Sequence, residues 1–450
     1  MDVCVTDYGV KPDGTLQTAG IQQAIDDCFA HGGGTVRIPS GEFFTGGLRL
    51  RSNITLYLCR GAVLKGSRDI TEYSSVLSDK VEPINDSDRT EVLWSYARPE
   101  RDNSYLLKPV SSWNNALIRA IDAENVSVIG EDGSVIDGCD PYDETGEEHY
   151  RGPHGIDMHR CRNVTLKGYT LMNTGNWAHA IYFSSGITIS GVTVLAGHDG
   201  AHFSSCDDIF IENSKLATGD DCIAGFDNNN VTVINCELNS ACSAFRFGGN
   251  KVRVEDCHIY GPAEHLFRGG LSVEEKKQGV HASTAGGRYN MLSVFTYYAD
   301  YTLKIRKEPG DILFKNCRVE NTTRFIHYNF SGNEPWQLAR PLSSVRFKNV
   351  SVDGVTMPIH LYGDESSRIS VTLDGVHYKM TEGNDCRELF KIAHIEKLSV
   401  RNVTVENFRG DTVFASWGDV REISLDNFNL GDDAEALTVS RSDKFECTPI

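Results

Sequence analysis

A short repeat in the middle of the chain constrains the fold more than any other feature. Between residues 160 and 260, a strand-like pattern recurs with its second residue at steps of 23, 22, 22 and 21. Each copy alternates apolar and polar residues, as a half-buried strand does. Strands that return every 22 residues without helices between them predict a parallel β-helix, whose coils pair about 4.8 Å apart. The copies are Asn163-Val164-Thr165-Leu166, Gly186-Ile187-Thr188-Ile189, Asp208-Ile209-Phe210-Ile211, Asn230-Val231-Thr232-Val233 and Lys251-Val252-Arg253-Val254.

Polar residues share one register after these strands. Stacked side chains of this kind can hydrogen-bond to each other and to neighbouring backbone at a turn. The cysteines that follow three of them are expected to stack inside. A β-sandwich is the alternative, but sandwiches favour antiparallel hairpins with turn dipeptides. The polar positions are Asn213, Asn235, Asp256, Asn316, Asn349, Asn402 and Asn427, and the cysteines are Cys236, Cys257 and Cys317.

The solenoid is predicted to form one domain over residues 1–450, with a cap and first coils in 1–60. Residues 17–30 predict a helix that ends at Gly32-Gly33-Gly34 and covers the open end of the solenoid. The stretches 70–115 and 261–302 break the repeat and predict two loop insertions, after which coils resume from 303 to 430. The apolar face of the helix is expected to hold Ile21, Ala24, Ile25, Cys28 and Phe29.

Charge and cysteine content limit the partners and the compartment. The net charge is −18, which argues against nucleic acid or an anionic membrane as the main partner, but not against an acidic sugar held locally. Thirteen cysteines without a CxxC pair predict mostly buried, reduced thiols. The run Met1–Val5 shows no signal-peptide features, so we expect a cytoplasmic location, or secretion if a leader was removed.

Three aspartates stand out within the repeat. Asp199 and Asp221 are 22 residues apart, so they should lie one strand spacing apart on one face. Asp220 precedes Asp221 and requires a bend, which Gly219 offers. Crowded carboxylates repel, so one keeps a proton while another stays ionised, as glycoside hydrolysis requires. Solvated turn acids are the alternative interpretation.

Other polar residues near these aspartates are candidate substrate contacts. His198 and His202 flank Asp199, and Trp177 and His179 lie about one coil earlier. A three-histidine metal site is an alternative, but the spacing fits no zinc pattern. Purely structural roles stay open as well. Lys304 and Arg306 alternate along an expected strand and could clamp an acidic group, or form a solvated charged face.

Several sequence motifs resemble those of glycoside hydrolase family 28, the polygalacturonase family. The resemblance implies a right-handed parallel β-helix, with Asp220 as general acid and Asp199 with Asp221 activating the water. The resemblance covers nearly the whole chain, to about residue 430. The residues that carry it are Asp7-Tyr8-Gly9, Asp13-Gly14, Gln22-Gln23-Ala24-Ile25, the run from Gly32 to Gly41, Thr45-Gly46-Gly47-Leu48, Gly61-Ala62-Val63-Leu64, Val135-Ile136-Asp137-Gly138 and Gly219-Asp220-Asp221-Cys222.

The chain departs from two further family motifs. Cys242 stands where the family has the histidine of Gly-His-Gly, and Lys304-Ile305-Arg306 exchanges the two cations of Arg-Ile-Lys. Arg246, His265 and Arg268 are additional polar residues expected nearby. The hydrolytic carboxylates are therefore expected to be retained in a rebuilt substrate subsite.

These observations predict an inverting, exo-acting glycosidase for uronic-acid-containing or related oligosaccharides. No metal and no organic cofactor are expected, because no phosphate-binding loop and no metal-ligand spacing is present. The oligosaccharide is the one expected partner. A lyase or epimerase on the same scaffold, and a non-catalytic carbohydrate-binding solenoid, remain as alternatives.

Overall fold

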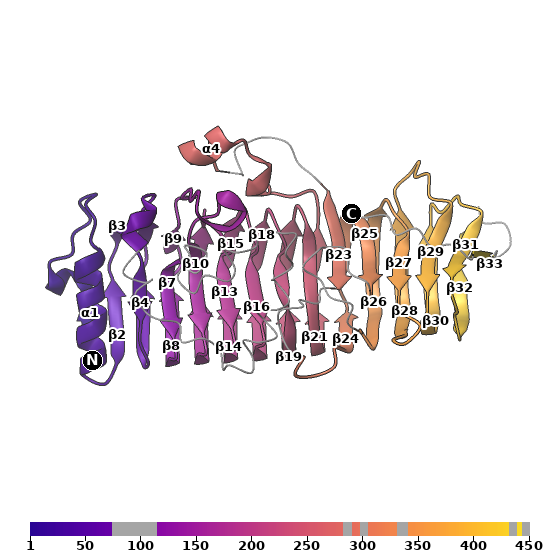
Figure 1. Cartoon of the computed structure of the whole chain (residues 1–450), viewed down its shortest axis with the longest axis horizontal. Coiled ribbons are helices and arrows are strands. Elements are labelled where there is room, and N and C mark those ends of the chain that lie inside the picture. The colour runs from indigo at the N-terminus through magenta and orange to yellow at the C-terminus, as the bar shows by residue number, and fades with distance from the viewer. Residues whose placement is uncertain (74–114, 282–289, 298–304, 331–340, 432–438, 443–450) are drawn as a thin grey trace.

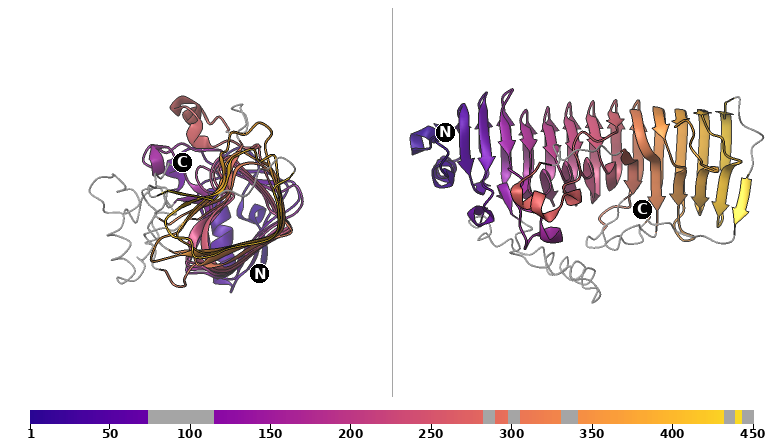
Figure 2. Two further views of the ribbon diagram at one scale, coloured as in Figure 1. Left: turned by 90° about the vertical axis from the view of Figure 1, so that its right-hand side faces the viewer. Right: turned by 90° about the horizontal axis from the view of Figure 1, so that it is seen from above.

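The structure is a computed structural model that describes residues 1–73, 115–281, 290–297, 305–330, 341–431 and 439–442. Strands stack side by side along one long axis, with helix α1 (Thr18–Ala30) at one end (Figure 1). Seen along that axis, the chain winds around a single interior (Figure 2). Every strand pairing between named strands is parallel, so the β-helix predicted from the repeat is confirmed.

The strands fall into three parallel sheets, to which successive coils contribute in turn. Sheet 1 contains β1 (Asp2–Cys4), β2 (Gly34–Ile38), β5 (Ile54–Leu58), β8 (Glu124–Gly130), β11 (Arg162–Lys167), β14 (Ser185–Ser190), β17 (Asp207–Glu212), β24 (Gly310–Lys315) and β32 (Ile423–Asn429). Sheet 2 contains β3 (Gly41–Thr45), β6 (Ala62–Gly66), β9 (Val135–Asp137), β12 (Thr170–Met172), β15 (Thr193–Ala196), β18 (Lys215–Thr218), β20 (Glu237–Ser240) and β22 (His258–Tyr260). Sheet 3 contains β4 (Leu48–Leu50), β7 (Ala116–Ile121), β10 (His154–His159), β13 (His179–Tyr182), β16 (Ala201–Ser204), β23 (Met291–Tyr297), β27 (Ile359–Tyr362), β29 (Glu388–Ala393), β31 (Thr412–Trp417) and β33 (Val439–Ser442).

Longer strands turn the corners between these sheets. β19 (Ile223–Ile234) and β21 (Ser243–Glu255) run from sheet 3 into sheet 1, and β25 (Arg318–Asn329) runs from sheet 2 into sheet 3. β26 (Ser344–Val355), β28 (Ile369–Met380) and β30 (Ile395–Glu406) run from sheet 1 into sheet 2. Backbone hydrogen bonds therefore continue around the corners as well as along each sheet.

The register of sheet 1 is the one that the repeat predicts. Val164 pairs with Ile187, Ile187 with Ile209, Ile209 with Val231 and Val231 with Val252. All five side chains are buried in one apolar core. Burial of this row fixes the register, because a shift by one residue would move every apolar side chain to the outer face.

The predicted polar register is also confirmed. Asn213, Asn235 and Asp256 have φ values of 50°, 51° and 55°, in the left-handed region that asparagine and aspartate tolerate. The Asn235 amide donates to Asn213 at 2.7 Å, and Asn316 donates to Asp256 at 3.1 Å. These side chains stack at one corner of successive coils. The cysteines that follow, Cys236, Cys257 and Cys317, are buried, as predicted.

Most cysteines in the described part of the chain are buried, and all of them there are free thiols. This agrees with the expectation of small, reduced, hydrophobic side chains.

Helix α1 caps the end of the solenoid near β1 and β2. Ile21, Ala24, Ile25 and Cys28 are fully buried, as predicted. The prediction is wrong for Phe29, which is 43% exposed. Phe29 lies in the last turn of the helix, at the rim of the core, where the guanidinium of Arg51 lies 5.6 Å from its ring.

The two predicted insertions differ from expectation in part. In the first, Ile70–Tyr73 form a short 3₁₀ helix, and residues 74–114 lie outside the described residues. The second contains a 3₁₀ helix (Arg268–Gly270) and helix α4 (Val273–Gln278). The prediction of a loop is wrong for Met291–Tyr297, because this segment is strand β23 of sheet 3. The strand could not be recognised from the 22-residue period, because it lies within the 42 residues from 261 to 302 that interrupt the repeat.

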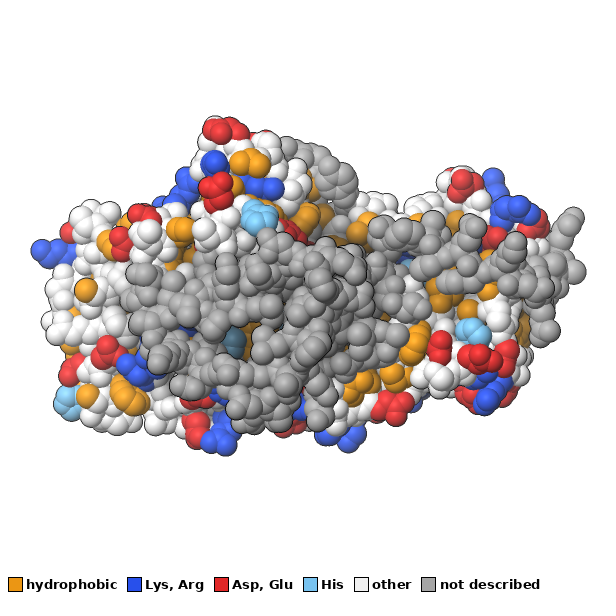
Figure 3. All heavy atoms as spheres, viewed as in Figure 1, with side chains coloured by type: hydrophobic (Ala, Val, Ile, Leu, Met, Phe, Trp, Pro, Cys, Tyr) orange, Lys and Arg blue, Asp and Glu red, His pale blue; other side chains and the backbone are white. Residues whose placement is uncertain are grey.

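The described surface carries both signs of charge. Acidic and basic side chains are interspersed on the face seen in Figure 3. Among the described residues, no helix is long and apolar enough to cross a membrane.

Candidate active site

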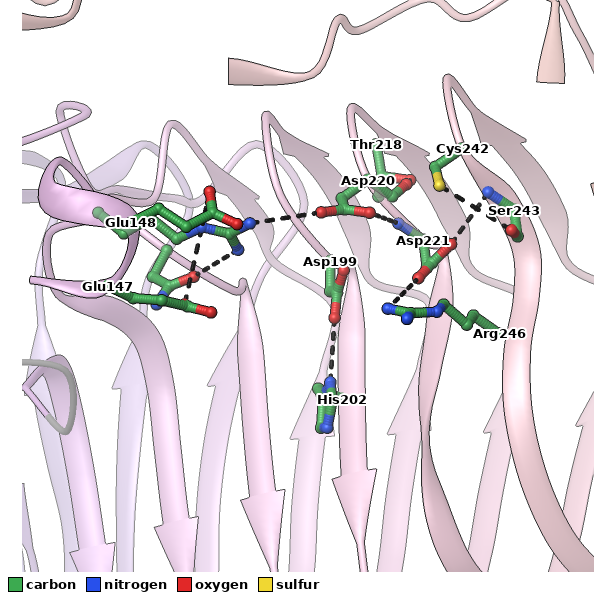
Figure 4. A network of polar contacts seen from close by, with 12 residues as sticks. Glu147, Glu148, Asp199, His202, Thr218, Asp220, Asp221, Cys242, Ser243 and Arg246 are labelled. Atoms are coloured by element: carbon green, nitrogen blue, oxygen red, sulfur yellow. Dashed lines mark hydrogen bonds and ion pairs between the residues drawn. The ribbon is translucent and has the colours of Figure 1, made fainter. Parts of the chain in front are cut away.

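Two of the three aspartates occupy equivalent places in neighbouring coils. Asp199 stands two residues before the start of β16, and Asp221 two residues before the start of β19, at the corner between sheets 2 and 3 (Figure 4). The Gly200 N–H donates to the Asp221 carbonyl at 2.9 Å, so the two turns stack directly. The spacing of 22 residues therefore predicted the juxtaposition correctly.

Asp220 projects from a tight bend beside them. Its carbonyl accepts hydrogen bonds from the hydroxyls of Thr218 and Ser240, both at 2.6 Å, and these bonds fix the bend. Gly219 is needed for space rather than for an unusual φ, because a Cβ there would lie 2.2 Å from the Leu266 carbonyl oxygen.

The three carboxylates differ in exposure. The side chain of Asp220 is 19% exposed, whereas those of Asp199 and Asp221 are 6% and 1% exposed. Burial, and next the charge of Asp220, raise the pKa of Asp199 well above its usual range; the same causes raise the pKa of Asp221. Burial and mutual repulsion therefore disfavour full ionisation of the cluster, and Asp220 is its most accessible member.

Two arginines contact this cluster from opposite sides. Arg151 places Nη2 3.6 Å from Asp220 Oδ2, and Arg246 on β21 places Nη1 4.0 Å from Asp221 Oδ2. The prediction that Arg246 lies near the aspartates is confirmed. Together the arginines offset part of the negative charge of the three aspartates.

Arg151 belongs to a group that sequence reasoning missed. Its Nε lies 3.1 Å from Glu148 Oε2 and 3.6 Å from Glu147 Oε2, and both glutamates lie in a 3₁₀ helix (Glu147–His149). Burial raises the pKa of Glu147 to about 8, while Arg151 lowers it. The charged run 143–151 lies outside the repeat, so the sequence shows that it is unusual. Its sequence does not indicate which coil of the solenoid it approaches.

His202 and Trp177 form one edge of the site. His202 Nδ1 lies 3.0 Å from Asp199 Oδ2, and its ring stacks on Trp177 with centroids 3.8 Å apart and planes 2° apart. Trp177 is half-buried. Both residues lie where sequence reasoning expected substrate contacts.

Four other predicted substrate contacts lie in the interior, so those predictions are wrong. His179 is 1% exposed and is held by the Tyr169 hydroxyl and the Gly200 carbonyl. Its neighbour two residues on, Ile181, also faces the core, as the alternation of a strand requires. His198 is fully buried between the rings of Tyr150 and Phe267.

His265 and Arg268 are buried as well. His265 is 3% exposed, and its Nδ1 lies 3.4 Å from the Leu266 carbonyl. Arg268 is fully buried and donates to the carbonyls of Gly175, Asp140 and Pro141. Arg268 thus ties the second insertion to two loops next to the site, rather than reaching a substrate.

The expected cation pair is not at the site either. Lys304 lies outside the described residues. Arg306 lies in a bend, not in a strand, and forms ion pairs with Asp207 at 2.7 Å and with Asp227 at 2.6 Å. Asp227 is six residues beyond Asp221, roughly 20 Å along an extended strand. The prediction that Arg306 clamps an acidic group beside the aspartates is therefore wrong, because its guanidinium serves these two carboxylates elsewhere.

One group of side chains has the geometry of possible metal ligands. Ligand atoms of Asp220, Asp221 and Cys242 lie within 4.8 Å of one another. Burial and the charge of Asp221 raise the pKa of the Cys242 thiol well above its usual range, and Arg151 and Arg246 contact the two carboxylates. A protonated thiol and two adjacent cations fit a bound metal ion poorly.

Comparison with known proteins supports the resemblance. The family described as glycosyl hydrolases family 28 matches residues 104–253. A probable polygalacturonase from Vitis vinifera is 30% identical over 234 residues, covering 49% of this chain and 43% of the relative. An exo-poly-alpha-D-galacturonosidase from Dickeya chrysanthemi is 28% identical over 269 residues, covering 49% of this chain and 41% of the relative.

A solved structure shares the fold across the chain. The hyperthermoactive exopolygalacturonase from Thermotoga maritima matches with a TM-score of 0.60 and 16% identity, covering 95% of this chain and 92% of the other. The matches to the two curated relatives span less than half of each relative's length. Over residues 104–253 this chain is therefore similar to the glycosyl hydrolases family 28, and it shares a β-helix fold with the Thermotoga maritima enzyme.

Proposed function

We propose that this protein is an inverting glycosidase that hydrolyses uronic-acid-containing oligosaccharides of the galacturonide type. The observation that carries the proposal is the row of three carboxylates at one corner of the solenoid, with the most exposed one beside two buried ones. Asp220 would protonate the leaving oxygen, because it is the carboxyl that an incoming sugar can reach. Asp199 and Asp221 would hold and activate the attacking water on the side of the sugar opposite the leaving oxygen.

The surrounding groups suit this division of labour. Arg246 and Arg151 limit the repulsion among the three carboxylates, so they can stay close together without unfolding the corner. The His202 contact orients Asp199, and the Trp177 ring offers an apolar face against which a sugar can pack. The names of the two curated relatives, a polygalacturonase and an exo-poly-galacturonosidase, support a galacturonide as substrate.

We also propose that cleavage is exo-acting. The second insertion folds back over earlier coils, as Figure 1 shows for α4. Arg68 donates to the carbonyls of Lys277 and Gln278, and Arg268 binds the loop at Asp140. This wall, made of residues 138–153 and 261–281, contacts the coil of Asn239 through Pro262 and extends back past the carboxylates to Arg68. A wall at one end of the site favours a pocket that accepts a chain terminus. Free thiols favour a reducing compartment, where the substrates would be short oligosaccharides.

Digestion of polygalacturonate and of defined oligogalacturonides tests the substrate and the mode. Release of monosaccharide with slow loss of viscosity supports exo-action, whereas a rapid viscosity drop with a ladder of oligomers contradicts it.

An unsaturated product absorbing in the ultraviolet would favour the lyase alternative, and binding without turnover would favour a non-catalytic solenoid. Activity should survive dialysis against EDTA; loss that Ca²⁺ or Zn²⁺ restores would contradict a metal-free reaction.

A further inference from the structure

Sheet 3 carries a second polar cluster, beyond the carboxylates toward the C-terminus. Arg246 pairs with Thr296, Thr296 with His327, His327 with His360 and His360 with Lys391, on five successive strands. The residues on both sides of each, such as Phe245 and Phe247 or Ile359 and Leu361, belong to the core. Since side chains alternate along a strand, this row points out of the solenoid on the same face as the candidate site.

Arg324 extends the carboxylate row itself. The Ser243 N–H donates to Asp221 at 3.0 Å, and Ser293 pairs with both Ser243 and Arg324. Arg324 also stands three residues before His327, as Asp199 stands three residues before His202. Arg324 thus lies three coils beyond Asp221, about 14 Å along the stack at 4.8 Å per coil.

The side chain of Arg324 is buried, and none of the carboxylates that the structure describes pairs with it. Its residue is only 7% exposed, and its Nε is buried with no hydrogen-bond acceptor. Across the residues that the structure describes, no carboxylate lies within ion-pair distance of it. A buried charge is costly unless it is paired, so an unpaired one in a surface row indicates that a ligand supplies the missing charge.

The neighbours of Arg324 are suited to a sugar acid. His360 is 7% exposed, its Nε2 is buried without a partner, and burial lowers its pKa to about 3, so it is uncharged at neutral pH. The ring of Tyr362 stacks on His360 with centroids 5.4 Å apart, and the ring of Trp417 lies 6.4 Å beyond Tyr362. Half-buried aromatic rings beside a cation offer packing surfaces for sugar rings.

We propose that Arg324, with His360 beside it, binds the carboxylate of a sugar unit that lies three coils beyond the hydrolysed bond. This deepens the proposed function and rests on it for the identity of the substrate as an oligo-uronide. The guanidinium fork would bind both carboxylate oxygens, and the neutral imidazole would hydrogen-bond to the same carboxylate or to a hydroxyl. The row runs away from the wall formed by residues 138–153 and 261–281, so the bound chain extends toward β29.

The experiment measures binding without turnover. The Asp220→Asn variant is titrated by calorimetry with tetragalacturonate and with its fully methyl-esterified form. We expect the acid to bind more tightly than the ester, and Arg324→Gln in the same background to weaken binding of the acid by about tenfold or more while leaving the ester unaffected. Arg387→Gln, at an exposed ion pair with Asp411, is the matched control and should change neither.

Thermal unfolding of the free variants separates binding from a structural role. Removal of an unpaired buried charge should leave the Tm of Arg324→Gln unchanged or raise it, whereas a clear fall in Tm would overturn the proposal. Equal weakening of acid and ester, or no weakening of either, or no binding of tetragalacturonate at all, would also overturn it. If the acid binds through Arg324 but the wild-type protein does not cleave it, the proposed function fails and this site stands. If the wild type cleaves tetragalacturonate and Arg324→Gln binds it normally, the proposed function stands and the Arg324 site fails.

Discussion

The two ends of the row on sheet 3 compensate their charges in opposite ways. At Asp199, Asp220 and Asp221, three carboxylates meet two arginines and a histidine of the same chain. At Arg324, a buried cation meets no carboxylate of the described residues. The first end compensates its charges within the protein and crowds its carboxylates together, which suits proton transfer. The second end leaves a charge for a ligand to neutralise, which suits recognition.

The largest expected effect comes from the exposed carboxyl of the acidic end. Asp220→Asn should lower kcat by at least about 10²-fold, because the variant cannot donate a proton to the leaving oxygen. Binding of the substrate should persist, because the cationic end is unchanged. Steady-state kinetics on an oligogalacturonide measures the effect. Asp208→Asn is the control: the exposed Asp208 carboxylate on β17 accepts a hydrogen bond from Asn230, and this variant should retain full activity. Comparable losses in both variants would refute the role of Asp220.

The next effect tests whether Arg151 holds the acidic end together. Arg151 is 5% exposed in its side chain and contacts Glu147, Glu148 and Asp220. Arg151→Gln should reduce the free energy of unfolding by about 3 kcal/mol, because buried carboxylates lose their counter-charge. Arg162→Gln, at an exposed pair with Glu124, should cost at most about 1 kcal/mol. Urea unfolding compares the two, and equal small losses would contradict the account.

The pH dependence of stability is a smaller effect of the same charges. Folding raises the pKa of Glu147 from 4.5 to about 8, so its contribution to stability is complete below pH 4.5 and is lost as the pH rises through 8. The raised pKa values of Asp199 and Asp221 act in the same direction. Within this window, Glu147 alone should lower the free energy of unfolding by about 1.4 kcal/mol for each unit that the pH rises.

Glu147→Gln should therefore flatten the fall in Tm between pH 5 and pH 8. Glu124→Gln, at an exposed glutamate, should leave the wild-type pH profile unchanged. A Glu147→Gln profile that matches the wild type would show that this carboxyl is not held protonated.

The smallest effect distinguishes Arg306 from Arg324. Arg306 already has Asp207 and Asp227 as partners, so Arg306→Gln should leave kcat/KM for an acidic oligosaccharide unchanged. A loss of tenfold or more would restore the sequence-based prediction that Arg306 grips the substrate. The measurement needs only initial rates at low substrate concentration.

What the sequence predicts well follows directly from the period. A step of 22 residues places Asp199 beside Asp221, and the same step aligns Asn213 with Asn235. Strand alternation would also have assigned His179 to the interior, since Ile181 two residues on is apolar. Proximity in sequence to the aspartates therefore does not by itself place a side chain in the site.

What the sequence does not predict comes from segments outside the period. Arg151 reaches Asp220 from a loop, and Arg268 is buried by contacts with Gly175 and Asp140 that no spacing encodes. The pattern Lys304-Ile305-Arg306 has the alternation of a strand, yet β23 (Met291–Tyr297) occupies the strand next to β21. Phe295 of β23 packs against Phe314 in the core.

The central claim is a single displacement in which Asp220 gives a proton and the buried pair activates water. Proton NMR of the wild-type protein acting on an α-linked oligogalacturonide reports the anomeric form of the first sugar released, before it mutarotates. The account predicts the inverted β-anomer, because the water attacks the face opposite the leaving oxygen. Retention of the α-anomer would contradict it.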